Sequence, residues 1–254
     1  MALRPGDPVC LVDARGRVVG LRAPAAGDVV RVPGLGVVPG TPLLEAGFGG
    51  ELLLGSHELF VMRPTPALMA RAVEHVTQVI HAKDAGRIIA EVGVRPGDTV
   101  VEGGTGSGAL TSSLALLVGD TGHVHGHEPN GKHRDVTAAS LETFGLAGRV
   151  TLWSEPLEST TVTGADAFIV DLPDPRSVVA AAARALAPGG RLAVYAPQVT
   201  QIQAVVQEAR SAGFGDVHVL EVLERPWVVD AERVRPSHDM LGHTAFLMFG
   251  VRCP

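Results

Sequence analysis

Thr99-Val-Val-Glu-Gly-Gly-Thr-Gly-Ser-Gly-Ala-Leu-Thr111 reads as an apolar strand that ends in an acid and continues through a glycine turn into a helix. Glycines let the backbone turn sharply and come close to a ligand, and the N-terminus of the following helix offers amide groups that have no partner. The stretch therefore predicts a site for a nucleotide-like cofactor at the end of this strand. A glycine turn that only joins a strand to a helix is the plain alternative.

Two kinds of cofactor are compatible with the glycine pattern. Gly104, Gly106 and Ala109 satisfy the dinucleotide fingerprint G-x-G-x-x-G/A, which makes a dehydrogenase one interpretation. An acid at about the spacing of a ribose-binding residue follows at Glu128. However, the turn directly follows the acid Glu102 and carries no basic residue, which favours a ligand with an ammonium group over a pyrophosphate. S-adenosylmethionine carries that group at its amino acid end, and Glu128 would bind its two ribose hydroxyls.

Length, composition and charge are those of a globular protein. The 254 residues suffice for one large domain and a small accessory one, with 46% hydrophobic and 19% charged residues. A net charge of -6, with Lys83 and Lys132 as the lysines, argues against a broad nucleic-acid surface, although arginines gathered on one face or contributed by several chains could still bind RNA. Cys10 and Cys253 form neither a metal spacing nor a disulfide framework. Because the chain also shows no signal core and no apolar run of membrane-spanning length, we expect a soluble, cytoplasmic protein.

Two regions follow one another along the chain. Residues 1–62 contain short apolar runs that Gly, Pro or Asp interrupts every few residues, which predicts a small β domain. A lead-in at 63–97 is expected to hold two helices, Ala67–His81 and Lys83–Val92. The chain is then expected to alternate between strands at 98–102, 123–128, 149–153, 166–171 and 190–196 and helices at 107–117, 130–144, 175–186 and 198–212. This alternation predicts an α/β fold with a doubly wound, largely parallel sheet.

The end of the chain changes character. A strand-like segment at Val217–Leu223 precedes an irregular stretch at Pro226–Pro236, and a last strand is expected at Thr244–Val251. A terminal β hairpin on a parallel sheet is the arrangement of class I methyltransferases.

Polar side chains follow the expected strands, where ligands bind in open α/β sheets. Four strand ends carry a carboxylate, at Glu102, Glu128, Glu155 and Asp171, and a fifth ends in Tyr195-Ala-Pro197. Asp171 precedes a proline-rich turn that cannot continue the strand, so its side chain is expected to project into the cleft.

Five regions of the chain carry a resemblance to a known family. In chain order they are Thr77-Gln-Val-Ile-His-Ala-Lys-Asp84, Glu102-Gly-Gly-Thr-Gly-Ser-Gly-Ala-Leu-Thr111, Asp171-Leu-Pro-Asp-Pro175, Val199-Thr-Gln201, and Arg235-Pro-Ser-His238 with Gly242-His-Thr-Ala-Phe-Leu247. Together they resemble the tRNA (adenine-N1)-methyltransferases that modify adenine 58 in the T-loop, which are class I methyltransferases that use S-adenosylmethionine. The similarity runs in order over nearly the whole chain.

The resemblance implies a small N-terminal β domain at 1–62 and a Rossmann-like methyltransferase domain at 63–254, with a mostly parallel sheet and an antiparallel C-terminal hairpin. It also implies a homotetramer that binds tRNA across subunits. The residues that would hold S-adenosylmethionine are Gln78, Glu102, Gly104, Thr105, Gly106, Ser107, Gly108, Glu128, His133, Glu155 and Asp171.

The resemblance further implies roles at the acceptor. Asp171 would lie beside the methyl group and accept a hydrogen bond from the exocyclic amine of adenine, with Tyr195 nearby, while N1 attacks the sulfonium methyl. Because N1 lies on the pairing edge, the base must leave its stack. His81, His238 and His243 are expected at the substrate pocket, and no metal site is predicted because neither cysteines nor a carboxylate cluster accompany the histidines.

The chain departs from the family at positions that concern the acceptor. The family commonly has tyrosine, another aromatic residue and tryptophan where this chain has His81, His127 and Arg176. Two alternatives to a tRNA substrate therefore stay open. One is a diverged relative that methylates a small metabolite or nucleoside, and the other is a cofactor-binding partner subunit that has lost catalysis.

Overall fold

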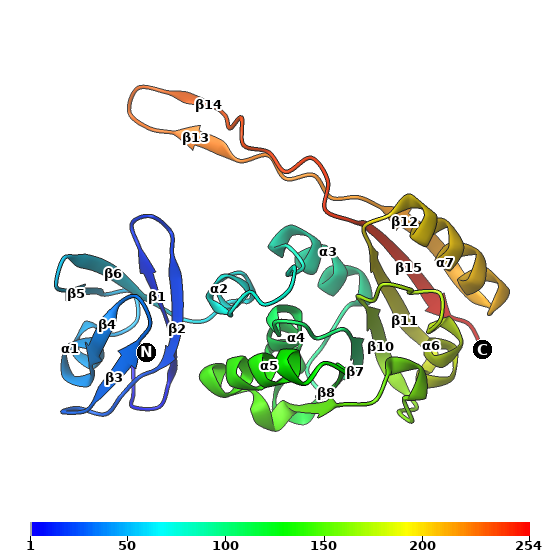
Figure 1. The fold of residues 1–254 in the computed structure, drawn as a ribbon, viewed down its shortest axis with the longest axis horizontal. Helices are drawn as coiled ribbons and strands as arrows, with labels where there is room; N and C mark the ends of the chain where they lie inside the picture. The colour runs from blue at the N-terminus through cyan, green and yellow to red at the C-terminus, as the bar shows by residue number, and fades with distance from the viewer. Residues whose placement is uncertain (1) are drawn as a thin grey trace.

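The computed structural model describes residues 2–254. The molecule is elongated, with a small N-terminal sheet at one end and a larger sheet, here called the central sheet, in the rest of the body (Figure 1). The N-terminal sheet is antiparallel, with strand order β2-β1-β6-β5. Its strands are β1 (Pro8–Asp13), β2 (Val18–Arg22), β5 (Glu51–Leu54) and β6 (His57–Met62), and the hairpin of β3 (Val29–Val32) and β4 (Gly36–Pro39) leads into α1 (Gly40–Ala46). Leu11, Leu43 and Leu59 are fully buried in its core. The expected β character is present, and the domain boundary at residue 62 stays a prediction.

The first helix of the lead-in is shorter than expected. Helix α2 (Pro66–Ala72) begins where Thr65 Oγ1 accepts a hydrogen bond from the Leu68 amide at 3.2 Å. It ends at Ala72, so the helix expected over Ala67–His81 is wrong from Val73 onward. Residues 73–81 hold several β-branched side chains, which disfavour a helix. Their backbone instead passes beside the glycine turn before α3 (Ala82–Val92), which forms as expected.

The central sheet has seven strands in the order β12-β15-β11-β10-β7-β8-β9. Five run parallel, namely β7 (Thr99–Gly103), β8 (His123–His127), β9 (Val150–Trp153), β10 (Ala165–Val170) and β11 (Leu186–Ala196). At one edge β15 (Phe246–Arg252) lies antiparallel between β11 and β12 (Phe214–Leu220). This arrangement confirms the predicted mostly parallel sheet with an antiparallel C-terminal hairpin.

Helices cover both faces of this sheet because its buried strands are apolar on both sides. Ala167 and Ile169 of β10 pack in one core with α3, α4 (Ala109–Val118) and α5 (Gly131–Phe144), whereas Phe168 and Val170 pack in another core with α6 (Val179–Ala185) and α7 (Val199–Ser211). Helix α6 was expected at 175–186, and it starts four residues later than expected, at Val179. None of the helices within residues 2–254 is long and apolar enough to span a membrane.

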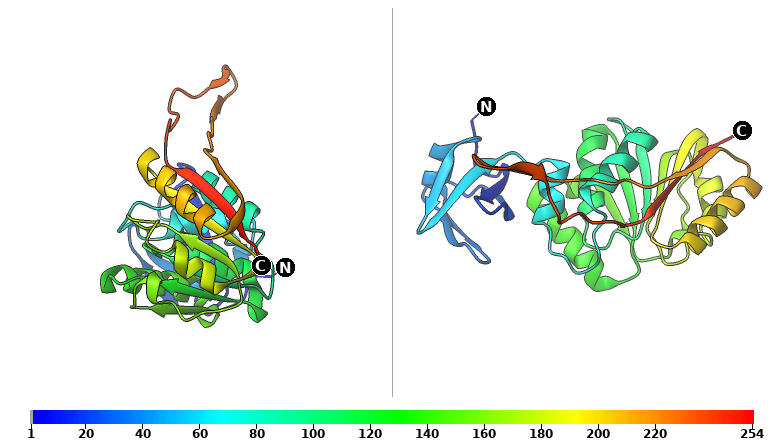
Figure 2. Two further views of the ribbon diagram at one scale, coloured as in Figure 1. Left: turned by 90° about the vertical axis from the view of Figure 1, so that its right-hand side faces the viewer. Right: turned by 90° about the horizontal axis from the view of Figure 1, so that it is seen from above.

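Residues 221–245, here called the arm, connect β12 to β15 and project from the body (Figures 1 and 2). The stretch that was expected to be irregular contains a short hairpin, in which β13 (Trp227–Val229) pairs with β14 (Val234–Pro236). Large apolar side chains of the arm are exposed, at Leu223, Trp227, Val229, Val234 and Leu241.

Candidate active site

The glycine turn has a backbone that only glycine accommodates well. Gly104, Gly106 and Gly108 have φ values of +82°, +53° and +78°. A Cβ atom on Gly104 would lie 2.1 Å from the carbonyl oxygen of Asp171, and one on Gly108 would lie 3.0 Å from the Cα atom of Thr137. The turn is therefore packed directly against the backbone that follows β10 and against Thr137 of the helix that follows β8.

Glu102 is a buried acid with an unmet bonding requirement. Glu102 is the second-last residue of β7, directly before the glycine turn, and it is 2% exposed. Its Oε2 atom has no hydrogen-bond partner within the part of the chain that the structure describes. Burial raises the pKa of this carboxyl to about 8, and the charges of Asp171 and Glu128 add to the shift. A buried carboxylate oxygen without a partner is unfavourable, and a bound ammonium group would supply that partner.

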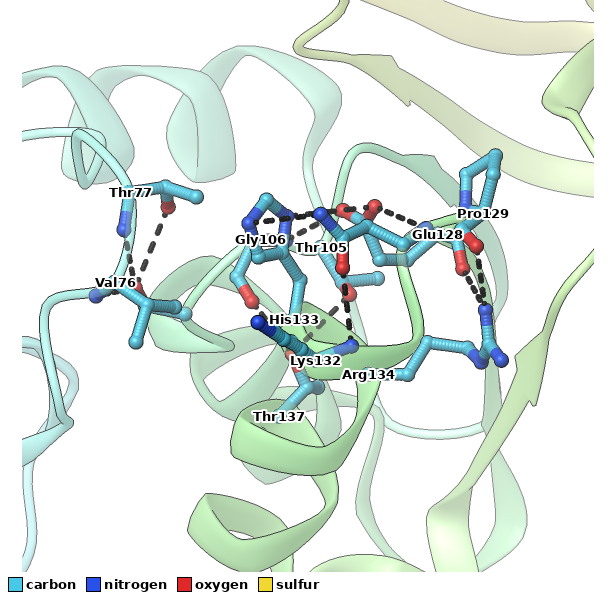
Figure 3. Close-up of polar contacts among 12 residues, drawn as sticks. Val76, Thr77, Thr105, Gly106, Glu128, Pro129, Lys132, His133, Arg134 and Thr137 are labelled. Atoms are coloured by element: carbon cyan, nitrogen blue, oxygen red, sulfur yellow. Dashed lines mark hydrogen bonds and ion pairs between the residues drawn. The ribbon is translucent and has the colours of Figure 1, made fainter.

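Glu128 lies on the other side of the turn, directly after β8. Its Oε2 atom accepts a hydrogen bond from the Gly106 amide at 3.1 Å, and its Oε1 atom accepts one from the Asn130 amide at 3.0 Å (Figure 3). His133 Nδ1 is 3.6 Å from Oε1. Since each carboxylate oxygen can accept more than one hydrogen bond, the group is held in place and can still bind hydroxyls.

Three hydroxyl groups connect the glycine turn to neighbouring segments. Thr105 Oγ1 is 3.2 Å from Thr137 Oγ1, which donates to the Gly106 carbonyl at 3.1 Å (Figure 3). Ser107 Oγ accepts hydrogen bonds from the amides of Val76 at 3.1 Å and Thr77 at 3.4 Å. The extended segment 73–81 is thereby attached to the turn.

Asp171 follows β10, and its amide donates to the Gly103 carbonyl at 2.9 Å. Burial, and then the charge of Glu128, raise the pKa of the Asp171 carboxyl to about 7. Tyr195 on β11 is buried, and burial together with the charge of Asp171 raises its pKa to about 12. At neutral pH the Tyr195 hydroxyl therefore keeps its proton, whereas Asp171 is poised between its two protonation states.

Two small cavities flank the contact between Gly104 and the Asp171 backbone. One, of about 30 Å³, is lined by Gln78, Glu102, Asp171 and the glycine turn. The other, of about 170 Å³, is bounded by His127, Pro129, Pro156, Leu157, Glu158, Leu172, Pro173, Asp174 and Ser177. Both cavities lie at the carboxyl ends of the parallel strands.

The predicted Glu155 lies at the edge of this region. Its side chain is exposed, and its carbonyl oxygen is 3.1 Å from Nδ1 of His127. Because a carbonyl can only accept, His127 Nδ1 carries the proton in this contact. His127 Nε2 is 3.1 Å from Thr160 Oγ1, and the ring stacks on Trp153 with 6.0 Å between centroids.

The three histidines expected at the substrate pocket have different surroundings. His81 is exposed before α3 and faces a cavity of about 200 Å³ that the arm helps to line. His243 lies at the root of the arm, with Nδ1 2.6 Å from Glu221 Oε1 and Nε2 2.9 Å from the Pro197 carbonyl. His238 is exposed on the arm, where its side chain makes no hydrogen bond to any residue of 2–254. Over the same residues, no group of three or more His, Cys, Asp or Glu side chains is arranged to hold a metal ion.

Sequence reasoning assigned no role to three side chains that shape the site. Thr137 and Thr77 bond the glycine turn, and Gln201 Nε2 of α7 donates to the Pro173 carbonyl at 2.7 Å, which fixes the turn after Asp171. Thr77 and Gln201 stand in segments that carry the family resemblance, which was the available signal. Their partners are backbone or hydroxyl groups, which leave no pattern in the sequence.

Comparison with known proteins decides the family. The sequence model of the tRNA methyltransferase complex GCD14 subunit family matches residues 58–243. The chain belongs to this family. It is 36% identical over 248 residues to the tRNA (adenine(58)-N(1))-methyltransferase TrmI of Thermus thermophilus, which covers 96% of each chain. Membership confirms the sequence-based family assignment and sets aside the dehydrogenase interpretation.

Solved structures resemble the whole chain. A SAM-dependent O-methyltransferase of Thermotoga maritima has a TM-score of 0.82 at 27% identity, over 100% of this chain and 95% of that one. The tRNA (m1A58) methyltransferase TrmI of Aquifex aeolicus has a TM-score of 0.77 at 23% identity, over the full length of both chains. Family and fold together imply the use of S-adenosylmethionine, whose ammonium group suits the unpartnered Glu102 oxygen.

Proposed function

We propose that this chain transfers a methyl group from S-adenosylmethionine to N1 of adenine 58 in the T-loop of tRNA. The observation that carries the proposal is the set of three carboxylates, Glu102, Glu128 and Asp171, which end three neighbouring strands around one glycine turn. Its support is membership in a tRNA methyltransferase family and 36% identity to a tRNA (adenine(58)-N(1))-methyltransferase.

The residues around the turn suit the parts of S-adenosylmethionine. Glu102 would hold the ammonium group, with Gln78 and the glycine turn around the rest of the amino acid end. Glu128 would bind the ribose hydroxyls, with His133 beside it, and the cavity next to His127 would take the adenine end near Glu155. When bound, S-adenosylmethionine supplies a methyl group on a positively charged sulfur.

The acceptor chemistry would fall to Asp171 and Tyr195. Adenine becomes cationic when N1 is methylated, and a carboxylate bonded to the exocyclic amine stabilises that developing charge. The Tyr195 hydroxyl, which keeps its proton, would donate a hydrogen bond beside it. Because the base must leave its stack to reach Asp171, the site has to bind an extruded nucleotide.

Binding of S-adenosylmethionine is expected to release a proton from Glu102 at pH 7. The pKa of about 8 means that the free carboxyl is largely protonated at this pH, and a bound ammonium group would lower that pKa. The affinity should therefore rise with pH between 6 and 7, at most about tenfold per unit for one proton. Calorimetric titration in buffers of different ionisation enthalpy measures the release. Glu102→Gln should lower the number of protons released to the share that comes from Asp171, and equal release in both proteins would contradict the assignment.

An acceptor comparison tests the proposed function. Purified protein is incubated with labelled S-adenosylmethionine and one of three acceptors: unmodified tRNA, the same tRNA with guanine at position 58, or free adenosine. We expect label on the first acceptor only. Transfer to adenosine but not to tRNA would favour a small-molecule methyltransferase, to which the departures at His81 and Arg176 also point. Binding of the cofactor without transfer to any acceptor would favour a non-catalytic partner subunit.

We infer that the chain is a homo-oligomer, with a homotetramer as the expected form. The exposed apolar side chains of the arm support this inference, because projecting apolar surface favours association. A cytoplasmic location stays a prediction from the sequence.

Removing apolar side chains from the arm is expected to lower the oligomeric state. Trp227→Ser combined with Val229→Ser and Val234→Ser should reduce the mass in light scattering from four times 26.4 kDa to a smaller multiple, with binding of S-adenosylmethionine retained. An unchanged mass would exclude the arm as the contact.

A further inference from the structure

Lys83 and Asp84, near the start of α3, form a buried charged cluster with Thr244. Lys83 Nζ donates to Asp84 Oδ1 at 2.8 Å, to the Val222 carbonyl at 2.7 Å and to Thr244 Oγ1 at 2.6 Å. These contacts use all three N–H groups of the ammonium. Thr244 Oγ1 in turn donates to Asp84 Oδ2 at 2.7 Å. The Asp84 side chain is 0% exposed and that of Lys83 7%, so the cluster is shielded from water.

The cluster lies where the arm joins the rest of the molecule. Its outgoing leg is residues 221–226, between β12 and β13, and its returning leg is residues 237–245, between β14 and β15. Val222 stands two residues after the end of β12, and Thr244 stands two residues before the start of β15. Lys83 therefore joins the outgoing leg and the returning leg to the same helix. Next to Thr244, His243 bonds Glu221 on the other leg and the Pro197 carbonyl after β11.

The acceptor side of the candidate active site adjoins this cluster. The cavity of about 200 Å³ has walls from the α3 start and from both legs of the arm, at His81, Ala82, Lys83, Glu224, Pro226, Asp239 and Leu241. The charge of Asp84 also contributes to the raised pKa of Tyr195, after burial and Asp171, which sets Asp84 within electrostatic range of that hydroxyl. The returning part of the arm continues into β15, where Phe246 pairs with Ala196 and Leu247 with Tyr195 of β11. The position of the arm's two ends is therefore coupled by geometry to the strand that carries Tyr195.

Stability is a poor explanation for such a cluster. A buried ion pair gives up hydration, and apolar side chains of similar volume often replace it without loss. What apolar side chains do not reproduce is the set of four directed hydrogen bonds, which fixes three segments that are distant in the sequence.

We propose that Lys83 and Asp84 are positioning residues, which hold the root of the arm against the acceptor side of the site so that the target nucleotide meets Asp171 in the right place. The inference rests on the proposed function, because it takes RNA as the acceptor. Loss of the cluster lets the legs separate, which weakens the binding of tRNA and leaves the binding of S-adenosylmethionine at the glycine turn intact.

Two variants separate positioning from stability. Lys83→Met keeps the length of the side chain but leaves the buried Asp84 charge with only the Thr244 hydroxyl as a partner, so it should lose stability. Lys83→Met with Asp84→Leu removes both charges and should regain much of that stability. In both variants we expect the KM for tRNA to rise by about tenfold or more while the affinity for S-adenosylmethionine stays within about twofold.

Hydrogen exchange gives a readout that does not depend on activity. In both variants the amides of residues 221–224 and 241–245 should exchange about tenfold faster or more, while those of β7 keep their protection. Lys132→Met, which removes the exposed lysine of α5, is the matched control and should leave exchange in the arm unchanged.

Unchanged exchange at the arm root in both variants would overturn the proposal. So would a double variant in which the KM for tRNA returns to the wild-type value together with stability. A wild-type protein that methylates no tRNA would instead overturn the proposed function and the coupling to RNA, and the exchange rates would still show whether the cluster holds the arm.

Discussion

Asp171→Ala lowers the rate of methyl transfer about 10²–10³-fold, the loss expected when one preorganised electrostatic group is removed from a reacting centre. The variant keeps the backbone hydrogen bond from residue 171 to Gly103, so the glycine turn should keep its shape, and saturating S-adenosylmethionine offsets the affinity that the carboxylate contributes. Single-turnover kinetics with saturating S-adenosylmethionine and tRNA measures the effect. Asp171→Asn is the matched control, since it keeps the shape and one acceptor oxygen while removing the charge. A loss below about tenfold in both variants would exclude Asp171 as the catalytic group.

The same residue sets a pH dependence. The pKa of Asp171 is raised to about 7, so the free enzyme loses the carboxylate as the pH falls below that value. The kcat/KM for S-adenosylmethionine, which reports the free enzyme, should decline on the acid side, and the decline in kcat should lie at lower pH because the cationic cofactor lowers the pKa. Asp171→Asn should lack the part of this decline that belongs to residue 171. An identical acid limb in the two proteins would assign it to another group.

Gly104→Ala is expected to abolish cofactor binding, with a loss of affinity of about 100-fold or more, because ligand sites tolerate only small displacements. The new Cβ would lie 2.1 Å from the Asp171 carbonyl oxygen, and the backbone there has a φ of +82°. Either the turn or the end of β10 must then move, and a non-glycine residue in this conformation costs roughly 1–2 kcal/mol besides. Calorimetric titration with S-adenosylmethionine measures the affinity, and thermal unfolding shows whether the fold survives.

Gly86→Ala provides the control for that experiment. Gly86 lies within α3, and a Cβ there has no atom within 4 Å, so alanine should be accepted and should favour the helix. The titration should then match the wild type. Near-normal affinity in Gly104→Ala would mean that the close contact with Asp171 does not shape the cofactor site.

The features that the sequence predicted well are those that local patterns encode. An apolar strand, an acid and a glycine turn identify the end of β7, and the same logic finds Glu128 and Asp171 because parallel strands end at one edge of a sheet. Alternation of strands and helices predicted the sheet, because each crossover needs a helix.

The errors arise where distant residues decide the local structure. The segment 73–81 has apolar side chains at Val73, Val76 and Ile80, a spacing that also suits a helix. Its amides at Val76 and Thr77 bond Ser107 instead, about 30 positions away in the chain. No window of sequence around residue 76 contains that partner.

The burial of the Lys83–Asp84 pair could not be predicted from the local sequence either. Adjacent opposite charges near a helix start usually lie in solvent, and the partner that buries them, Thr244, stands 160 residues away from Asp84. The hairpin of the arm was not predicted because its two strands are only three residues long, and irregular segments separate them from the central sheet. The shared role of His81, His238 and His243 at the acceptor stays a prediction.

Nucleoside analysis of methylated tRNA tests the central claim most directly. Unmodified tRNA is incubated with S-adenosylmethionine and either the wild-type protein or Asp171→Ala, digested, and analysed by mass spectrometry, with the modified position mapped on the intact strand. The account predicts 1-methyladenosine at position 58 with the wild type and little or none with the variant in the same time. Methylation of another nucleoside, or equal yields from the two proteins, would contradict it.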